Sequence, residues 1–417
     1  MDLLKVVDIE DAQNVLYECL EEFSREKISI DTPDSYGNII YEDLHSREDV
    51  PSFRRSAVDG YAVVSTDLGA ASESVPVFLK MVGKVNMGKA SDFTVKSGEC
   101  VYVPTGGAVP EGADAMVMIE YTDTIGTSKI SISQSSANGA HIIKIGEDTL
   151  SGDLIVTKGT VITSQVIGIL SAAGYEKVDV CKPLKMAIIS TGDEIVDTST
   201  VPKPGQIREV NTYALSAQAQ KNGYEVISHF VLPDDRQLIY NTINELKGKV
   251  DIICTSGGSS KGEKDFTADI INESGNPGVI IHGIAIKPGK PTILGFDKQT
   301  KTIMTGLPGH PVSAFIIFEL LFGALNRKYA ETQPPLPYYA KISQNLPGSP
   351  GKTTCIPVKL TRIDENHKTG CDCGYKATPV FGKSGLISTL AQADGYIIID
   401  RNKEGLIEGE QVKVHMI

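Results

Sequence analysis

The chain of 417 residues has no tryptophan, and its seven cysteines are few and irregularly spaced. An odd number leaves at least one cysteine unpaired under any disulfide scheme, so the sequence fits a reducing compartment better than a disulfide-stapled secreted fold. Cys371 and Cys373 form the only close pair, and no second cysteine or histidine cluster of zinc spacing accompanies them. We therefore expect a cytoplasmic protein in which these two cysteines lie in a surface turn.

Long apolar runs and an excess of basic residues are also missing. The longest apolar stretch, residues 314–325, contains Glu319 and is far shorter than the roughly 20 residues of a membrane span, so it predicts a buried core helix. The first residues are acidic and helix-like, and we expect no signal peptide. The formal net charge of −12 disfavours nucleic acid or an anionic membrane as a partner. An anionic ligand would require cations to be concentrated locally.

Residues 1–180 contain segments with the apolar spacing of helices and a region of short strand-like runs. Residues 7–24 and 164–173 have apolar side chains at helical spacing. The region between them consists of short apolar runs separated by glycine, proline and aspartate, at residues 61–64, 77–85, 100–103, 115–121 and 129–133. We predict a β-rich lid domain at residues 49–140, inserted into a discontinuous connecting domain made of residues 1–48 and 141–180.

Residues 181–330 show the strongest architectural pattern. Strand-like runs at residues 186–190, 226–232, 251–255, 279–286 and 302–306 alternate with helix-like segments at residues 211–222, 234–246, 265–273 and 311–325. This alternation predicts an α/β domain with a parallel sheet covered on both faces. Asn211 and Asp234 suit helix N-caps, and Pro311 suits a first helical turn.

The proline-rich segment 333–338 indicates a linker, and the β-like runs after it predict a small barrel or sandwich at residues 331–417. The expected fold class is therefore multidomain α/β.

Glycine, proline or charged residues follow every strand predicted in the α/β domain. Because ligands of open α/β sheets bind at the carboxyl ends of the strands, these positions are the candidate site. The segment 256–265 (SGGSSKGEKD) is neither a Walker A loop nor a Rossmann fingerprint. Its backbone N–H groups could hold a phosphate through Gly257, Gly258 and Ser260, although an ordinary loop is the alternative.

Two further groups carry charge suited to a ligand. Lys287 and Lys290 lie in the turn KPGKP and would bind an oxyanion or phosphate, unless the turn is merely solvated. Glu194, Asp234 and Asp265 could converge as oxygen ligands for Mg²⁺, although Asp234 could equally serve only as a helix cap. A lone His310 indicates a structural or lining role.

Several motifs, taken in their order along the chain, resemble those of the molybdopterin molybdenumtransferase family. The C-terminal region of gephyrin belongs to this family. The motifs are PSFRRSAVDGYA at residues 51–62, PTGGAVPEGAD at 104–114, STGDE at 190–194, PGQIREVN at 204–211, KPGKP at 287–291, GLPGHPVSA at 306–314 and SGLISTLA at 384–391. The resemblance implies four domains per subunit and an elongated homodimer. It also implies an active cleft between the α/β domain of one subunit and the lid of the other.

The implied reaction is insertion of molybdate into the dithiolene of molybdopterin-AMP, with Mg²⁺-dependent release of AMP. By matching position, Asp59 and Thr105 would reach the site from the lid, and Glu194 and Asp265 would complete the catalytic set. The substrate would contact Gly257, Gly258, Ser260, Lys287, Lys290, Pro308, Pro311 and Ser384, with the metal held by Glu194, Asp234 and Asp265. The upstream adenylyltransferase is a further possible partner.

The sequence departs from the family pattern at a few positions. Ser259 stands where a hydrophobic residue is common, Lys261 adds a cation, His310 replaces the commoner asparagine, and Lys352 lies near where relatives supply an arginine. These changes leave the choice between molybdate and tungstate open. The rival interpretations are a molybdopterin adenylyltransferase or pyrophosphatase on the same α/β fold, and a non-catalytic pterin-binding or scaffold paralogue.

Overall fold

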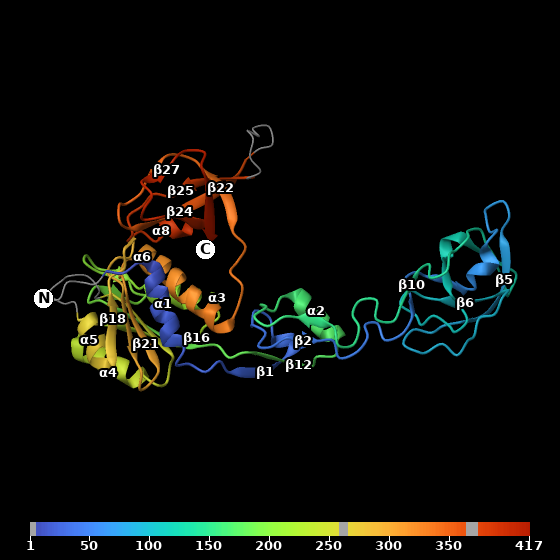
Figure 1. The fold of residues 1–417 in the computed structure, drawn as a ribbon, viewed down its shortest axis with the longest axis horizontal. Coiled ribbons are helices and arrows are strands. Elements are labelled where there is room, and N and C mark those ends of the chain that lie inside the picture. Colours follow the sequence, from blue (N-terminus) through green and yellow to red (C-terminus); the bar gives the residue numbers. More distant parts are fainter. Residues whose placement is uncertain (1–5, 258–265, 364–373) are drawn as a thin grey trace.

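The structure is a computed structural model that describes residues 6–257, 266–363 and 374–417. Figure 1 shows an elongated molecule with the β-rich lid at one end and the α/β domain and C-terminal barrel at the other. The connecting segments run between them. The predicted multidomain α/β architecture is confirmed.

The central sheet of the α/β domain has the strand order β16-β13-β17-β21-β20-β18. Its first four strands are parallel, as predicted, but the expectation of a sheet built only from parallel strands is wrong at one edge. The unpredicted strand β20 runs antiparallel to both neighbours, because residues 298–301 are too few for the crossover of about a dozen residues that parallel strands need. The bounds are β16 Glu225–Leu232, β13 Lys185–Thr191, β17 Ile252–Ser256, β21 Thr302–Leu307, β20 Ile293–Asp297 and β18 Pro277–His282.

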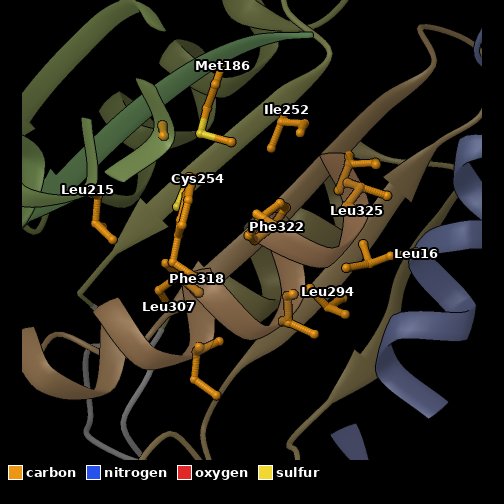
Figure 2. Packing of buried hydrophobic residues seen from close by; sticks show 14 of the residues in the cluster. Leu16, Met186, Leu215, Ile252, Cys254, Leu294, Leu307, Phe318, Phe322 and Leu325 are labelled. Atoms are coloured by element: carbon orange, nitrogen blue, oxygen red, sulfur yellow. The ribbon is translucent and has the colours of Figure 1, made fainter. Parts of the chain in front are cut away.

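Helices cover both faces of this sheet. Because successive residues of a strand face opposite sides, alternate residues pack into two separate clusters. On β13, Met186 and Ile188 belong to one buried cluster, whereas Ala187 and Ile189 belong to the other. The first cluster includes Phe318 and Phe322, and Figure 2 shows these rings beside Met186 and Cys254. The helices are α3 Asn211–Lys221, α4 Arg236–Leu246, α5 Thr267–Ser274, α6 Pro311–Phe318, the π-helix η4 Glu319–Gly323, and α7 Ala324–Ala330.

The apolar stretch 314–325 forms the predicted buried core helix, through α6 and η4 into α7. Within the described part of the chain, no helix is both long and apolar enough to cross a membrane.

Two of the predicted helix caps are wrong. The cap of α4 is Asp235, whose carboxylate accepts a hydrogen bond from the Leu238 N–H at 3.0 Å, so Asp234 lies one residue outside the helix. Asn211 is already helical, and the first turn of α3 is closed by Glu209, whose Oε1 accepts from the Thr212 N–H at 2.6 Å. The carboxylate of Glu209 performs the task expected of Asn211, which leaves the amide free to bond elsewhere.

The connecting region joins two distant chain segments. Strand β1 (Lys27–Asp31) pairs antiparallel with β12 (Lys177–Cys181), and Ile40, Leu170 and Val180 share one buried cluster. The first helix, α1 (Ile9–Leu20), instead packs on the core of the α/β domain, where Leu16 lies among the residues of Figure 2. The remaining elements are η1 Thr32–Asp34, β2 Leu44–His45, β11 Leu154–Val156 and α2 Ser164–Ala172.

The lid contains a six-stranded sheet of order β7-β4-β6-β5-β9-β8. All five predicted runs form strands, and the sequence pattern missed only the exposed edge strand β8. The bounds are β7 Ala115–Met118, β4 Gly60–Val63, β6 Glu99–Val103, β5 Val77–Lys84, β9 Lys129–Ile132 and β8 Thr122–Ile125, with η2 at Ser65–Leu68 and η3 at Ile119–Tyr121. The short pair β3 (Arg55–Ser56) and β10 (Ile142–Ile143) lies where the chain enters and leaves the lid.

The C-terminal domain is a closed barrel, one of the two forms predicted. The strands β24, β25, β22, β28 and β26 follow one another, and β26 pairs back onto β24. Strand β19 of the preceding domain adds to β24 in parallel, which joins the barrel to the α/β domain. The bounds are β19 Ile286–Lys287, β22 Tyr338–Ile342, β24 Thr353–Arg362, β25 Tyr375–Pro379, β26 Gly395–Ile399 and β28 Gln411–Met416, with α8 at Ser388–Ala391 and the small pair β23 Leu346–Pro347 and β27 Gly405–Leu406.

Candidate active site

A cavity of about 630 Å³ lies between the α/β domain and the barrel. The α/β domain contributes the KPGKP turn and the start of α6, and the barrel contributes β24 and the segment 380–389. Lys287, Lys290, Lys352 and His310 line it, and no carboxylate does so among the residues that the structure describes. The cavity therefore concentrates positive charge in a chain whose net charge is −12.

The KPGKP turn is held from two sides. On the barrel side, the Thr353 N–H donates to the Ala285 carbonyl at 2.9 Å, and β19 pairs with β24. On the other side, Gly289 has φ +116°, and a Cβ there would lie 2.4 Å from Cγ1 of Ile317. The backbone of the turn thus sits directly on α6, which explains a glycine between the two lysines. Both lysines remain exposed on this rigid support.

The barrel side of the cavity is attached to the start of α6 through Ser384. The Val312 N–H donates to the Ser384 carbonyl at 3.1 Å, and Ser384 Oγ lies 2.7 Å from Nδ1 of His310. Cys355 also lines the cavity, but burial raises the pKa of its thiol to about 12. The thiol is consequently protonated near neutral pH and is not a nucleophile.

The carboxyl ends of β13, β17 and β21 are in contact. Gly257, with φ +113°, follows β17 so closely to β13 that a Cβ would lie 2.4 Å from the Thr191 carbonyl oxygen. Asn211 donates from Nδ2 to Ser256 Oγ and to the Gly309 carbonyl, both at 2.8 Å. Asn211 therefore ties the end of β17 to the PGHP turn, a role that the sequence analysis missed because it assigned the residue to capping.

The carboxylates predicted as metal ligands follow neighbouring strands. Glu194 is exposed after β13, and Asp234 is half-buried after β16. The two loops touch, since the Asp234 N–H donates to Oδ1 of Asp193 at 3.1 Å. In residues 6–257, 266–363 and 374–417, no three histidine, cysteine or acidic side chains gather as a metal-binding group. The third predicted ligand, Asp265, lies outside the described residues.

The remaining predictions divide into three groups. Lys287, Lys290, Pro308 and Ser384 line the same cavity, and Pro311 begins the helix beside it. Gly258, Ser260 and Asp265, with Lys261, lie outside the described residues, as do Cys371 and Cys373. His310, interpreted as a structural or lining residue, does line the cavity, while Lys352 joins it from the barrel.

Asp59 and Thr105 form a unit in the lid. Oδ1 of Asp59 accepts the Thr105 N–H at 2.8 Å. Their loops are also joined through the backbone, because the Ser56 N–H donates to the Gly107 carbonyl and the Gly106 N–H to the Ser56 carbonyl. Asp59 and Thr105 are exposed, and Figure 1 shows the lid far from the α/β domain and the barrel, whose residues line the cavity. One chain does not bring these two residues to the lysines.

Comparisons with known proteins match most of the chain. Three family descriptions apply in succession: "MoeA N-terminal region (domain I and II)" at residues 7–174, "Probable molybdopterin binding domain" at 187–327, and "MoeA C-terminal region (domain IV)" at 339–417. A molybdopterin molybdenumtransferase of Bacillus subtilis is 31% identical over 390 residues, which cover 92% of this chain and 88% of that one. The chain belongs to the MoeA family of molybdopterin molybdenumtransferases.

Solved structures of the MoeA family share the whole architecture. A molybdopterin biosynthesis MoeA protein of Pyrococcus horikoshii has a TM-score of 0.81 at 28% identity, over 99% of this chain and 100% of that one. A second such structure from the same organism has a TM-score of 0.77 at 34% identity, over 99% of each chain. The family predicted from the motifs and its class, a transferase of molybdenum cofactor biosynthesis, are confirmed.

Proposed function

We propose that this MoeA-family chain inserts molybdate into adenylylated molybdopterin and releases AMP. The observation that carries the proposal is the cavity beside the KPGKP turn, where three lysines and a histidine meet without a described carboxylate. In an acidic protein such a cavity attracts a small dianion against the overall field. The family supports molybdopterin as the second substrate.

The protein's part in this reaction is to position two reactants and neutralise charge. Lys287 and Lys290 hold the oxyanion on a turn fixed by α6 and β24, so little reorganisation is needed when it binds. The Ser384 hydroxyl contributes a hydrogen-bonding group from the barrel, and Pro308 and Pro311 shape the wall between them. The dithiolene end of the pterin would approach this oxyanion along the cavity.

The nucleotide end belongs, in our proposal, to the carboxyl ends of β13, β16 and β17. There Gly257, Gly258 and Ser260 would contact the phosphate through their backbone N–H groups. Glu194 and Asp234, with Asp265, would hold Mg²⁺, since carboxylate oxygens are the hard donors that this ion prefers. The loops that carry Glu194 and Asp234 touch each other. When bound, Mg²⁺ neutralises charge on the phosphoanhydride of the substrate.

The lid residues require a second copy of the chain. Asp59 and Thr105 are held together and exposed, yet the two domains that line the cavity of the same chain lie at the other end of the molecule. We propose a cytoplasmic homodimer in which the lid of one subunit covers the cavity of the other, with Asp59 as its essential carboxylate. The adenylyltransferase that makes the substrate is the proposed upstream partner.

Release of AMP from molybdopterin-AMP tests the activity. The purified protein should release AMP only when both molybdate and Mg²⁺ are present. ATP-dependent adenylylation of molybdopterin instead would favour an adenylyltransferase. Binding of the nucleotide without release of AMP, with molybdate or tungstate, would favour a non-catalytic paralogue. Either result would overturn the insertase proposal.

Mixing two inactive variants tests the shared site. Asp59→Asn removes the lid carboxylate, and Lys287→Ala/Lys290→Ala removes the cavity cations, so each homodimer should be inactive. Random pairing of equal amounts makes about half of the dimers mixed, each with one intact site of two, so activity should return to about a quarter of the wild-type value. No recovery in a mixture shown by mass spectrometry to contain mixed dimers would contradict a shared site.

A further inference from the structure

His310 and Ser384 form a hydrogen bond between two domains at the wall of the cavity. His310 immediately precedes α6, and Ser384 lies 74 residues later in the barrel, with Nδ1 and Oγ 2.7 Å apart. The Val312 N–H fixes the backbone of Ser384 at the same place. The serine is therefore held by its carbonyl, and the direction of its hydroxyl depends on the histidine.

The protonation state of the histidine decides what the hydroxyl offers to the cavity. If Nδ1 lacks a proton, it accepts the hydroxyl hydrogen, and the serine oxygen turns its lone pairs toward any other ligand. If Nδ1 carries a proton, it donates to the serine oxygen, and the O–H is free to donate to an anion. A histidinium always has this second arrangement, because both ring nitrogens then carry protons.

The surroundings favour coupling between an anion and this proton. The charged or titratable groups that share the cavity wall with His310 are Lys287 and Lys290 from the KPGKP turn, Lys352 beside β24, and the buried thiol of Cys355. The start of α6 adds the positive end of a helix. A dianion bound in the cavity places negative charge beside this ring, which favours a second proton on it.

We propose that oxyanion binding in this cavity is linked to proton uptake by His310, which turns the Ser384 hydroxyl into a donor toward the anion. The inference rests on the proposed function in taking molybdate as the oxyanion. His310 is a positioning residue, since it acts through Ser384. By linkage, binding should weaken as the pH rises through the range in which histidines lose their proton, by at most about tenfold per pH unit.

Calorimetric titration of the full-length protein with molybdate, without the pterin substrate, tests this inference. Wild type should bind several-fold more tightly at about pH 6 than at about pH 8, the range across which histidines titrate. Titrations in two buffers of different ionisation enthalpy should show proton uptake. His310→Asn supplies a permanent amide donor, so its affinity should be nearly independent of pH and its proton uptake should vanish.

Ser384→Ala separates the hydroxyl from the charge of the ring. If the proton acts through the hydroxyl, this variant should bind more weakly and lose much of the pH dependence. The full wild-type pH dependence in Ser384→Ala, or in His310→Asn, would overturn the inference. Absence of molybdate and tungstate binding to wild type at every pH would also overturn it. Release of AMP, measured separately, decides the proposed function independently.

Discussion

The two ends of the central sheet both carry lysine, but they use it in opposite ways. At the amino end of β17, Lys247 donates to the Ser274 carbonyl and forms an ion pair with Asp297 at 3.2 Å. Its side chain is 16% exposed and that of Asp297 is 5% exposed. At the carboxyl end, Lys287 and Lys290 are exposed and form no ion pair with any described residue.

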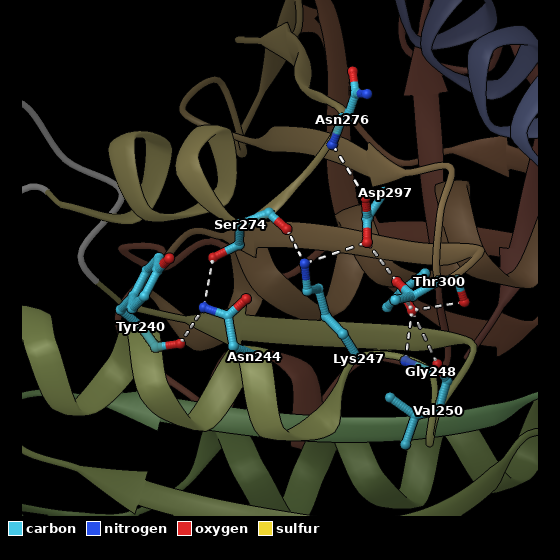
Figure 3. Close-up of polar contacts among 10 residues, drawn as sticks. Tyr240, Asn244, Lys247, Gly248, Val250, Ser274, Asn276, Asp297 and Thr300 are labelled. Carbon is cyan, nitrogen blue, oxygen red and sulfur yellow. Dashed lines mark hydrogen bonds and ion pairs between the residues drawn. The ribbon is translucent and has the colours of Figure 1, made fainter.

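The buried network satisfies nearly every donor and acceptor that it contains. Asp297 also accepts from the Thr300 hydroxyl at 2.6 Å and from the Asn276 N–H at 3.2 Å, as Figure 3 shows. The Asn244 amide extends the network to Tyr240 and Ser274. It links the ends of α4 and α5 to the β20–β21 turn, so its polar groups bond to one another and stabilise the domain.

The difference is that Lys247 is neutralised within the chain, whereas Lys287 and Lys290 remain available to a ligand. A buried lysine needs a partner because an unpaired charge away from water is costly. The exposed lysines of the KPGKP turn keep water as their partner until a ligand replaces it. Their support is rigid all the same, since Gly289 places the turn on α6.

We expect the largest effect from removing the two exposed lysines of the KPGKP turn. Lys287→Ala/Lys290→Ala should lower molybdate-dependent AMP release by at least about 1000-fold, equivalent to about 4 kcal/mol of barrier, because two charged contacts to the reacting anion are lost. The unfolding free energy should change by less than about 1 kcal/mol, since both side chains are exposed. Lys359→Ala, an exposed lysine elsewhere on β24, should leave both quantities unchanged. A comparable loss of activity in that control would refute a specific role for the turn.

We expect the next largest effect from removing Asp297, the charged partner of the buried Lys247. Asp297→Ala should lower the free energy of unfolding by about 3 kcal/mol in urea titrations, because it leaves Lys247 buried without its charged partner. AMP release below the melting temperature should be nearly unchanged, since the network lies at the opposite end of the sheet. Lys247→Met/Asp297→Leu, which removes both charges, should recover much of the loss. A cost below about 1 kcal/mol for Asp297→Ala would show that the pair contributes little.

We expect the smallest effect in the loss of folding stability at acidic pH. Burial raises the pKa of Asp297, but the hydrogen bonds from Thr300, Lys247 and Asn276 lower it more strongly. In the folded chain the pKa of Asp297 therefore lies below its ordinary value. An unfolded aspartate titrates near pH 4. The stabilisation from Asp297 is therefore complete above about pH 4 and is lost as the pH falls through the folded pKa. Urea titrations from about pH 5 to about pH 3 should show a smaller loss of stability in Asp297→Asn than in wild type; an equal slope would argue against this residue as a source of acid sensitivity.

Local patterns predicted most of the elements that position the site. Four parallel strands, their helices, the lid strands and the C-terminal barrel follow from apolar spacing and turn residues, because these depend on neighbours a few residues away. The misses have two different causes. Strand β20 has no helix before it to mark a βαβ unit, and Asp235 and Glu209 replaced the expected caps because the chain turns one or two residues away from the obvious capping residue.

The sequence by itself determined the family, the multidomain α/β class, and the lysines of the KPGKP turn as cationic residues of the candidate site. Only the tertiary structure decided that Lys352 and Ser384 from the barrel meet those lysines in one cavity, that Asn211 ties β17 to the PGHP turn, and that His310 bonds to Ser384. The physical reason is separation along the chain. These contacts join residues tens of positions apart. The contacts made by the barrel also require that β19 pairs with β24, which joins the barrel to the α/β domain.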